Sequence, residues 1–237
     1  VSFMAPGESG TLPSPLLPAH PSWLNYHALF ARAGMGRYFA NSLLVSSAIA
    51  ALSLACNTLA GYAFAKLAFS GRRALFRGVL AAVVIPTQVA MLPLFLELKY
   101  LGLVNSYAGV IVPALAGSFG IYLMREFACG IPDELIEAAR IDGAGEWRIF
   151  ARIVLPLLRP AMATLAILTF LAAWNDFMWP LIVLIGQEHY TLPVGLASLA
   201  REHAQDTELM MAGAVVTVLP ALALFLALQR YYLRGLL

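Results

Sequence analysis

Long uncharged stretches alternate with short charged ones along this chain of 237 residues. Four stretches lack Asp, Glu, Lys and Arg: those between Arg37 and Lys66, Arg77 and Glu97, Lys99 and Arg125, and Glu208 and Arg230. A fifth, from Pro160 to Gln187, is interrupted only by Asp176. About 20 apolar residues cross the roughly 30 Å of bilayer hydrocarbon as a helix. Because lipid offers no hydrogen bonds to open backbone groups, the pattern predicts an all-α, polytopic transmembrane helical bundle with five spans.

Two of these spans carry signals about their packing. The first, Tyr38 to Ala65, is rich in serine, alanine and glycine, and small residues let helix backbones approach closely in a membrane. The second contains Pro86 and Pro93, which remove backbone donors and bend or interrupt a helix. Such breaks are typical of a translocation pathway, and equally of a kink that only shapes packing.

Composition supports lipid as the surrounding solvent. Apolar residues make up 61% of the chain and charged residues 12%, with a mean hydropathy of +0.79. A soluble domain of this size cannot bury so much apolar surface. The net charge of +2 gives no indication of a nucleic-acid partner.

Positive charges are distributed unevenly among the segments between spans. Most of them lie in three places, namely after the first span, in or beside the loop 128–159, and after the last span. They are Lys66, Arg72, Arg73 and Arg77, then Arg125, Arg140, Arg148, Arg152 and Arg159, and finally Arg230 and Arg234. The other segments hold only Arg32, Arg37, Lys99 and Arg201. The positive-inside rule therefore predicts that the loop 128–159 and the C-terminus are cytoplasmic.

The same orientation places residues 1–37 outside the cytoplasm. This segment is polar and proline-rich and has no signal-like apolar core. We therefore expect an extracytoplasmic segment 1–37, a transmembrane domain 38–237, and a further span upstream of Val1. The alternative is a five-span protein with a translocated tail.

The loop 128–159 is a charged island between apolar stretches. Pro132, followed by Asp133 and Glu134, is typical of a helix start, and Gly143 or Gly145 predicts its end. Apolar residues then alternate with arginines at helical spacing from Trp147 onward, which predicts an amphipathic segment under the membrane. The island either presents a soluble partner with a docking helix or only anchors the bundle at the interface.

Asp176 is the one acid deep within a predicted span, in the sequence Trp174-Asn175-Asp176-Phe177. A charge at the bilayer centre costs about 2.5–3.5 kcal/mol on insertion scales, so it faces protein or water. It either lines a route for a polar solute or bonds a neighbouring helix.

Catalytic and metal-binding patterns are missing from the sequence. Cys56 and Cys129 are expected at different depths and predict no disulfide, and the four histidines lack metal-ligand spacing. Neither Lys66 nor Lys99 follows the glycines of a phosphate-binding loop. We expect no catalytic residue, no metal and no cofactor, so any ATP hydrolysis requires another chain.

One motif in the island resembles a known family signature. The motif consists of Glu137-Ala138-Ala139, Gly143 after three further residues, Ile153 after nine more, and Leu155-Pro156 after one more. It is similar to the complete EAA signature of permease subunits from binding-protein-dependent ABC importers. Stretches such as Gly61-Tyr62-Ala63-Phe64-Ala65, Ile131-Pro132-Asp133-Glu134-Leu135 and Trp174-Asn175-Asp176-Phe177 resemble the carbohydrate-uptake branch, specifically its maltose-type second permease subunit.

This resemblance implies a fold, partners and residue roles. The fold would be that of a type I ABC importer permease in the bacterial inner membrane, with the first of six family spans missing. A cytoplasmic ATPase dimer, binding ATP and Mg, would receive the EAA helix, and a second permease would complete a heterodimer. An extracytoplasmic solute-binding protein would dock outside, near Gly186 to Thr207. The coupling residues would be Glu137, Ala138, Ala139, Asp142, Gly143, Ile153, Leu155 and Pro156, and the pathway residues Trp174, Asn175 and Asp176.

The implied function is ATP-driven import of a sugar or sugar derivative. The competing hypothesis is a stand-alone ion- or proton-coupled secondary transporter that uses Asp176. A membrane-embedded enzyme ranks last, because only Asp176 lies at depth. The sequence does not identify the solute or the partner permease, nor whether this chain contacts the solute.

Overall fold

The computed structural model describes residues 1–237 except 11–16, 19, 32, 203–205 and 235–237. The described residues form helices, turns and loops without strands, which confirms the all-α prediction. The chain divides into two compact units. Unit 1 comprises 1–45, 102–110 and 174–230, and unit 2 comprises 46–101, 111–173 and 231–237.

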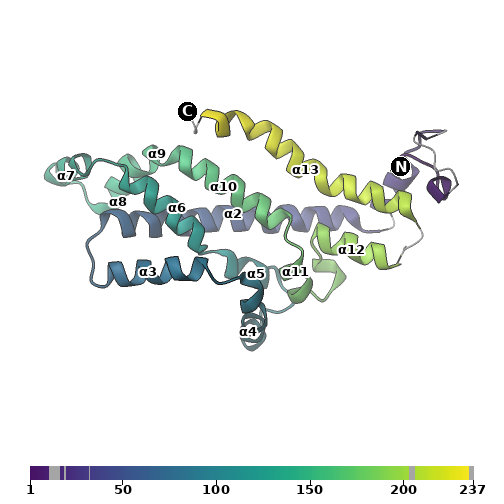
Figure 1. The fold of residues 1–237 in the computed structure, drawn as a ribbon, viewed down its shortest axis with the longest axis horizontal. Helices are drawn as coiled ribbons and strands as arrows, with labels where there is room; N and C mark the ends of the chain where they lie inside the picture. The colour runs from purple at the N-terminus through teal and green to yellow at the C-terminus, as the bar shows by residue number, and fades with distance from the viewer. Residues whose placement is uncertain (11–16, 19, 32, 203–205, 235–237) are drawn as a thin grey trace. The chain divides into compact units, whose positions relative to one another are not determined.

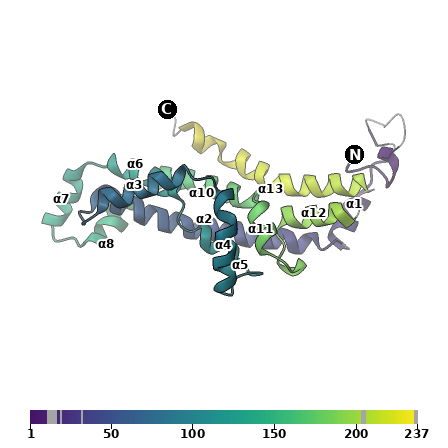
Figure 2. The same ribbon diagram turned by 60° about the horizontal axis from the view of Figure 1, so that its bottom comes forward.

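The helices are labelled in Figures 1 and 2. The longer ones are α1 (Leu24–Ala31), α2 (Met35–Lys66), α3 (Arg72–Val83), α4 (Thr87–Tyr100), α6 (Ser118–Cys129), α7 (Asp133–Ile141), α10 (Arg159–Trp174), α12 (Leu192–Glu202) and α13 (Thr207–Arg234). Short helices and turns are η1 (Glu8–Gly10), α5 (Tyr107–Ile111), η2 (Val112–Ala114), α8 (Glu146–Ile149), the π-turn η3 (Phe150–Val154), α9 (Leu155–Leu157), α11 (Met178–Val183) and η4 (Gln187–His189).

Helix α2 runs without a break for 32 residues and contains the first predicted span. Its small residues permit close packing, as the sequence predicts. A Cβ on Gly61 would lie 2.6 Å from Met124 Cβ and 2.8 Å from the Arg125 backbone nitrogen. A Cβ on Gly120 would collide with the Asn57 side chain. Glycines on both helices therefore allow α2 and α6 to touch at backbone distance.

Three of the other four predicted spans are interrupted, whereas the last lies within the continuous helix α13. The chain direction changes by 107° between α3 and α4, and Pro86 lies at this bend, directly before α4. Pro93 lies inside α4 and does not end it. The stretch from Pro160 to Gln187 breaks after Trp174 and resumes as α11. Among the described residues only α2 is long and apolar enough alone to cross a bilayer, and up to four spans result if each bent pair counts as one. The number of five crossings stays a prediction.

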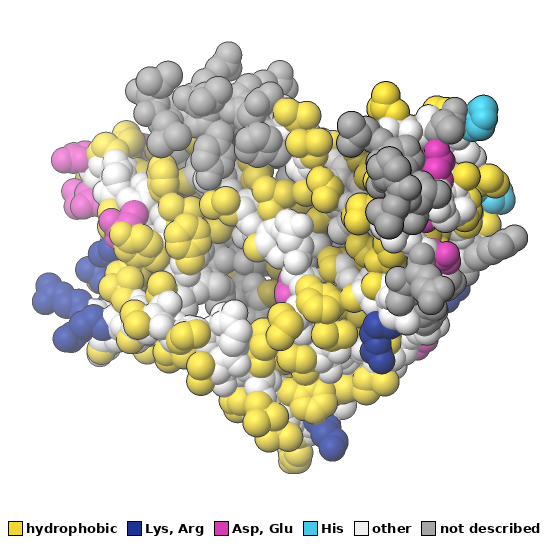
Figure 3. Space-filling model, turned by 45° about the vertical axis from the view of Figure 1, so that its right-hand side comes forward, with side chains coloured by type: hydrophobic (Ala, Val, Ile, Leu, Met, Phe, Trp, Pro, Cys, Tyr) yellow, Lys and Arg dark blue, Asp and Glu magenta, His cyan; other side chains and the backbone are white. Residues whose placement is uncertain are grey.

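Much of the surface is apolar. Hydrophobic side chains, in yellow, cover large parts of the face drawn in Figure 3, and large ones such as Val84, Val89 and Tyr100 are mostly exposed. Apolar patches of this extent on a helical protein fit a lipid environment.

The core of unit 2 joins the end of α2 to the predicted coupling loop. Figures 1 and 2 both show α7 and α8 next to that end. The buried cluster contains Tyr62 of α2, Met124, Ala128 and Ile131 from α6 and its end, Ile136 of α7, Ile149, Phe150, Val154 and Leu158 from 149–158, and Ala161 and Leu165 of α10. The loop is therefore part of the hydrophobic core and not an appendage.

Candidate functional site

Helix α7 begins where the sequence predicts. Pro132 is extended, with φ −57° and ψ 133°, and the next residue opens the helix. Asp133 and Glu134 occupy its first turn, where negative charge is favoured by the positive end of the helix dipole. Local chemistry thus determines the start of the nine-residue helix.

Gly143 ends α7. Its φ of +79° lies in the left-handed region, its N–H donates to the Arg140 carbonyl (3.0 Å), and the Ala144 N–H donates to the Ala139 carbonyl (2.9 Å). These two bonds form a Schellman motif, which satisfies carbonyls that the helix end would leave open. A Cβ on Gly143 would meet no atom within 4 Å. Within this chain the glycine is required by backbone conformation and not by space.

The two faces of α7 have different surroundings. Ile136 is 2% exposed and lies in the core of unit 2, with Ala139 packed beside it. On the other side Ile141 is 85% exposed and Leu135 is also exposed, as is Ala138 between them. Residues three apart share a helix face, so these three form an exposed apolar stripe, which we call the α7 stripe. Glu137 and Asp142 are exposed beside it.

A lysine at the end of α2 holds the start of α7. Lys66 Nζ donates to the Ile131 carbonyl (2.6 Å) and pairs with Asp133 Oδ1 (2.5 Å). The Lys66 side chain is 6% exposed. Its ammonium lowers the pKa of the Asp133 carboxyl, chiefly through the hydrogen bond.

A second polar link holds the end of α7. Glu146 accepts from the Tyr62 hydroxyl at Oε2 (2.9 Å) and from Arg140 Nε at Oε1 (2.8 Å). One carboxylate of α8 therefore connects α7 to α2. The sequence analysis missed the bracing role of Tyr62, Lys66, Arg140 and Glu146. The only signal available was a lysine and a tyrosine one helical turn apart at the end of an apolar span.

The second half of the signature lies at a change of helix type. Leu155 N–H donates to the Phe150 carbonyl, five residues back, which closes a π-turn. Pro156 follows and has no N–H to give, so the widened turn occurs where the regular ladder would fail. Ile153 and Leu155 pack against the core of unit 2. The run from Glu146 to Leu157 then bends by 76° into α10.

The predicted pathway residues lie at the break between α10 and α11. Trp174 is 0% exposed, and its Nε1 donates to the Thr217 carbonyl of α13 (3.0 Å). Asp176 is half-buried, and Oδ1 accepts from the Trp179 N–H (3.4 Å) in the first turn of α11. Asn175 is exposed at the same break. The indole is thus a core group, the carboxylate is bound to the start of a short helix, and their use in translocation stays a prediction.

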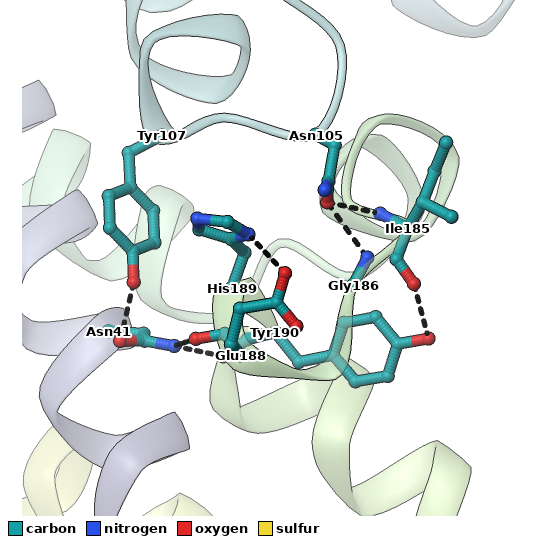
Figure 4. Close-up of polar contacts among 8 residues, drawn as sticks. All are labelled: Asn41, Asn105, Tyr107, Ile185, Gly186, Glu188, His189 and Tyr190. Atoms are coloured by element: carbon teal, nitrogen blue, oxygen red, sulfur yellow. Dashed lines mark hydrogen bonds and ion pairs between the residues drawn. The ribbon is translucent and has the colours of Figure 1, made fainter.

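A network of asparagine and tyrosine side chains occupies unit 1, beside the pair of His189 and Glu188 (Figure 4). Asn41, near the start of α2, is 7% exposed. Its Nδ2 donates to the carbonyls of Glu188 and Tyr190 (both 2.9 Å), and its Oδ1 accepts from the Tyr107 hydroxyl (2.8 Å). One amide thereby fixes the far end of residues 184–190, which we call the asparagine-held segment.

Asn105 holds the near end of that segment. Its φ of +59° is left-handed, a conformation that asparagine tolerates better than most residues. Oδ1 accepts from the N–H groups of Ile185 (2.9 Å) and Gly186 (2.8 Å), and the Asn105 N–H donates to the Val183 carbonyl (2.8 Å). The segment overlaps the start of the stretch Gly186 to Thr207. Residues 203–205 of that stretch lie outside the described residues. Sequence reasoning missed both asparagines.

A cavity of about 720 Å³ lies in unit 1. The asparagine-held segment contributes Gln187 and Glu188 to its lining, and Arg37 and Tyr38 of α2 and Gly195 of α12 also line it. The described lining does not include Trp174, Asn175 or Asp176. The predicted pathway residues therefore do not contribute to the described lining of this cavity.

Comparison with known proteins identifies the family. The family model for binding-protein-dependent transport system inner membrane components matches residues 57–237. The chain belongs to this family. It is an ABC importer permease, with 42% identity over 213 residues to the arabinooligosaccharides transport system permease protein AraQ of Halalkalibacterium halodurans, covering 90% of this chain and 76% of that protein.

Two further similarities extend along the permease chain. It is 36% identical over 234 residues to the diacetylchitobiose uptake system permease protein NgcG of Streptomyces coelicolor, covering 97% of this chain and 77% of that protein. The crystal structure of a bacterial ABC transporter involved in the import of the acidic polysaccharide alginate has a TM-score of 0.86 at 23% identity, covering 98% of this chain and 87% of that one. The predicted type I importer permease fold is confirmed.

Proposed function

We propose that this permease translocates a sugar or sugar derivative across the bacterial inner membrane and is driven by a separate ATPase through α7. The observation that carries the proposal is the α7 stripe. A nine-residue helix with its inner face in the core and Ile141 almost fully exposed has the form of a surface that a partner covers.

The bracing contacts support a mechanical role for α7. Lys66 and Glu146 connect the two ends of α7 to the last turns of α2, and Ile136 anchors it in the core. A rigid helix that is held at both ends transmits the displacement of a partner instead of absorbing it. An ATPase dimer that closes on ATP and Mg would thus move α2 and the helices packed on it.

Relatives support the solute class. Their names refer to arabinooligosaccharides, diacetylchitobiose and sn-glycerol-3-phosphate, the last from a Yersinia enterocolitica permease that is 31% identical and is matched along this whole chain. A carbohydrate or polyol derivative is therefore the proposed cargo. The other partners are a second permease and a solute-binding protein that docks outside, on the stretch Gly186 to Thr207. A crystal structure of an alginate transporter with its periplasmic protein, at TM-score 0.67, fits this assignment.

The test replaces the most exposed residue of the α7 stripe in the assembled importer. Ile141→Asp places a charge in the proposed contact, where a hot-spot residue contributes about 2 kcal/mol or more. We expect ATPase co-purification to fall about 30-fold or more and uptake to be lost. The matched control is Arg152→Ala, which changes an exposed residue of the same loop. Normal ATPase retention and uptake in Ile141→Asp would contradict the coupling role.

The secondary-transporter hypothesis makes the opposite prediction. It requires uptake without any ATPase and its loss in Asp176→Asn, because the carboxyl would be the coupling group. The bond from Asp176 to the start of α11 favours a structural carboxylate. Uptake by this chain in proteoliposomes without ATP would therefore contradict the importer proposal directly.

A further inference from the structure

Three arginines surround an open cleft of about 440 Å³ in unit 2. Arg72, Arg73 and Arg77 line it together with Phe69 and Gly71. Arg72 Nη1 donates to the Leu67 carbonyl (2.9 Å), and Arg77 Nε donates to the Arg73 carbonyl (3.4 Å). Within the described chain, none of the three pairs with a carboxylate.

The positions of these three positive charges are electrostatically unfavourable within the protein. Arg72 and Arg73 open α3, and its first turn contains no acid. The N-terminal end of a helix carries partial positive charge, so cations there are destabilised. Three guanidinium groups around one cleft also repel each other. An anion in the cleft would remove both penalties, and guanidinium groups bind phosphate in a bidentate manner.

The cleft also has an apolar border. Phe69 and Leu75 are exposed, and Phe64 contacts the rings of Phe69 (5.9 Å) and Phe76 (5.4 Å). Arginines beside phenylalanine and leucine side chains are typical of helices at the boundary between hydrocarbon and headgroups. Arg72 bonds to Leu67, next to Lys66, so the cleft lies at the same end of α2 as the coupling loop.

We propose that Arg72, Arg73 and Arg77 form a binding site for the phosphate of an anionic membrane lipid at the headgroup level. The guanidinium groups hold the phosphate, while the acyl chains lie against the exposed apolar side chains beside the cleft. This site is independent of the ATPase and solute assignments, because it requires only that the chain is embedded in a bilayer.

The test measures lipid retention on the detergent-purified importer by native mass spectrometry, during titration with phosphatidylglycerol or phosphatidylcholine. Each arginine near a charged membrane surface contributes a factor of about five. Arg73→Gln is therefore expected to weaken phosphatidylglycerol binding about fivefold, and Arg73→Gln with Arg77→Gln about 25-fold. Phosphatidylcholine binding is expected to stay unchanged.

Two controls keep the test specific. Lys99→Gln removes the same charge from an exposed position on α4 and is expected to have no effect. Arg73→Lys with Arg77→Lys retains the charge, and it is expected to recover part of the lipid preference while losing the bidentate contact. Inorganic phosphate at millimolar concentration is expected not to displace the lipid.

Three outcomes would overturn the proposal. One is equal retention of the two lipids by the unmodified importer. Another is an undiminished preference in the double glutamine variant. The third is displacement by free phosphate, which would assign the cleft to a soluble anion.

Discussion

The proposed coupling loop, residues 128–159, and the asparagine-held segment are held in place by different chemistry. In unit 2, α7 is attached through charged groups, the pairs Lys66–Asp133 and Arg140–Glu146. In unit 1, residues 184–190 are attached through the neutral amides of Asn41 and Asn105, which bond backbone groups. The Lys66–Asp133 pair and both asparagines connect residues far apart in the sequence.

The difference follows from what each device costs. Ion pairs with an exposed partner add about 0–1 kcal/mol, so the charged pairs position α7 more than they stabilise it. Neutral amides carry no charge to desolvate and satisfy backbone groups that would otherwise lose their bonds. We therefore expect the neutral device to contribute more stability and the charged device to contribute more to function.

Removal of the Asn105 side chain should have the largest effect on stability. Asn105→Ala removes the acceptor of two N–H groups and leaves alanine at φ +59°, which it tolerates less well than asparagine, and we expect a loss of about 3 kcal/mol. Asn105→Gly permits the same φ and should lose about 2 kcal/mol. Thermal unfolding in detergent measures both. Equal stability of alanine variant and wild type would show that the amide is not what holds the segment.

Replacement of Lys66 should have a smaller effect on stability and a larger one on transport. Lys66→Met leaves the Ile131 carbonyl without its donor, which costs about 1–2 kcal/mol, and it frees the start of α7. We expect ATPase-coupled uptake to fall further than the stability loss explains. Lys66→Arg, which can donate to both partners, is the control. If Lys66→Met transports normally, the brace has no role in coupling.

The cap of α7 should contribute about 1–2 kcal/mol to stability. Gly143→Ala forces a β-carbon into φ +79°, which costs about 1–2 kcal/mol. Gly145→Ala is a close control, because Gly145 has φ −72° and open space around it. We expect a change within about 0.5 kcal/mol there. Circular dichroism melting of both variants decides whether the glycine acts through backbone conformation, and equal melting would contradict that role.

The pH dependence of the Lys66–Asp133 pair should be the smallest effect. Lys66 lowers the pKa of Asp133 in the folded state, so the pair's contribution is fully present above the unfolded pKa of about 3.9. It is lost as pH falls through the lower folded value. The melting temperatures of wild type and Asp133→Asn, measured from neutral pH to below pH 4, should converge at the lowest pH. A difference in melting temperature that stays constant with pH would show that the Asp133 carboxylate is not the source of the stabilisation.

Several local features could be predicted from sequence because their causes lie within a few residues. Pro132 and the acids after it predict the start of α7, and Gly143 predicts its end, because dipole and cap interactions act over one helical turn. The interruption near Pro86 follows from the missing donor of proline. Pro93 is the same residue type and lies inside α4 without ending it, so proline alone does not decide where a helix stops.

The sequence by itself determined the lipid setting, the helical class and the exposed helix that carries the signature, since composition and short-range backbone chemistry suffice for these. Only the tertiary structure showed that Tyr62 meets Glu146, 84 residues away, and that Asn41 holds Tyr190, 149 residues away. Such pairs depend on which helix faces pack together. The hydrogen-bond partner of an uncharged polar residue in an apolar run is determined by packing, because burial leaves that residue few other groups to bond.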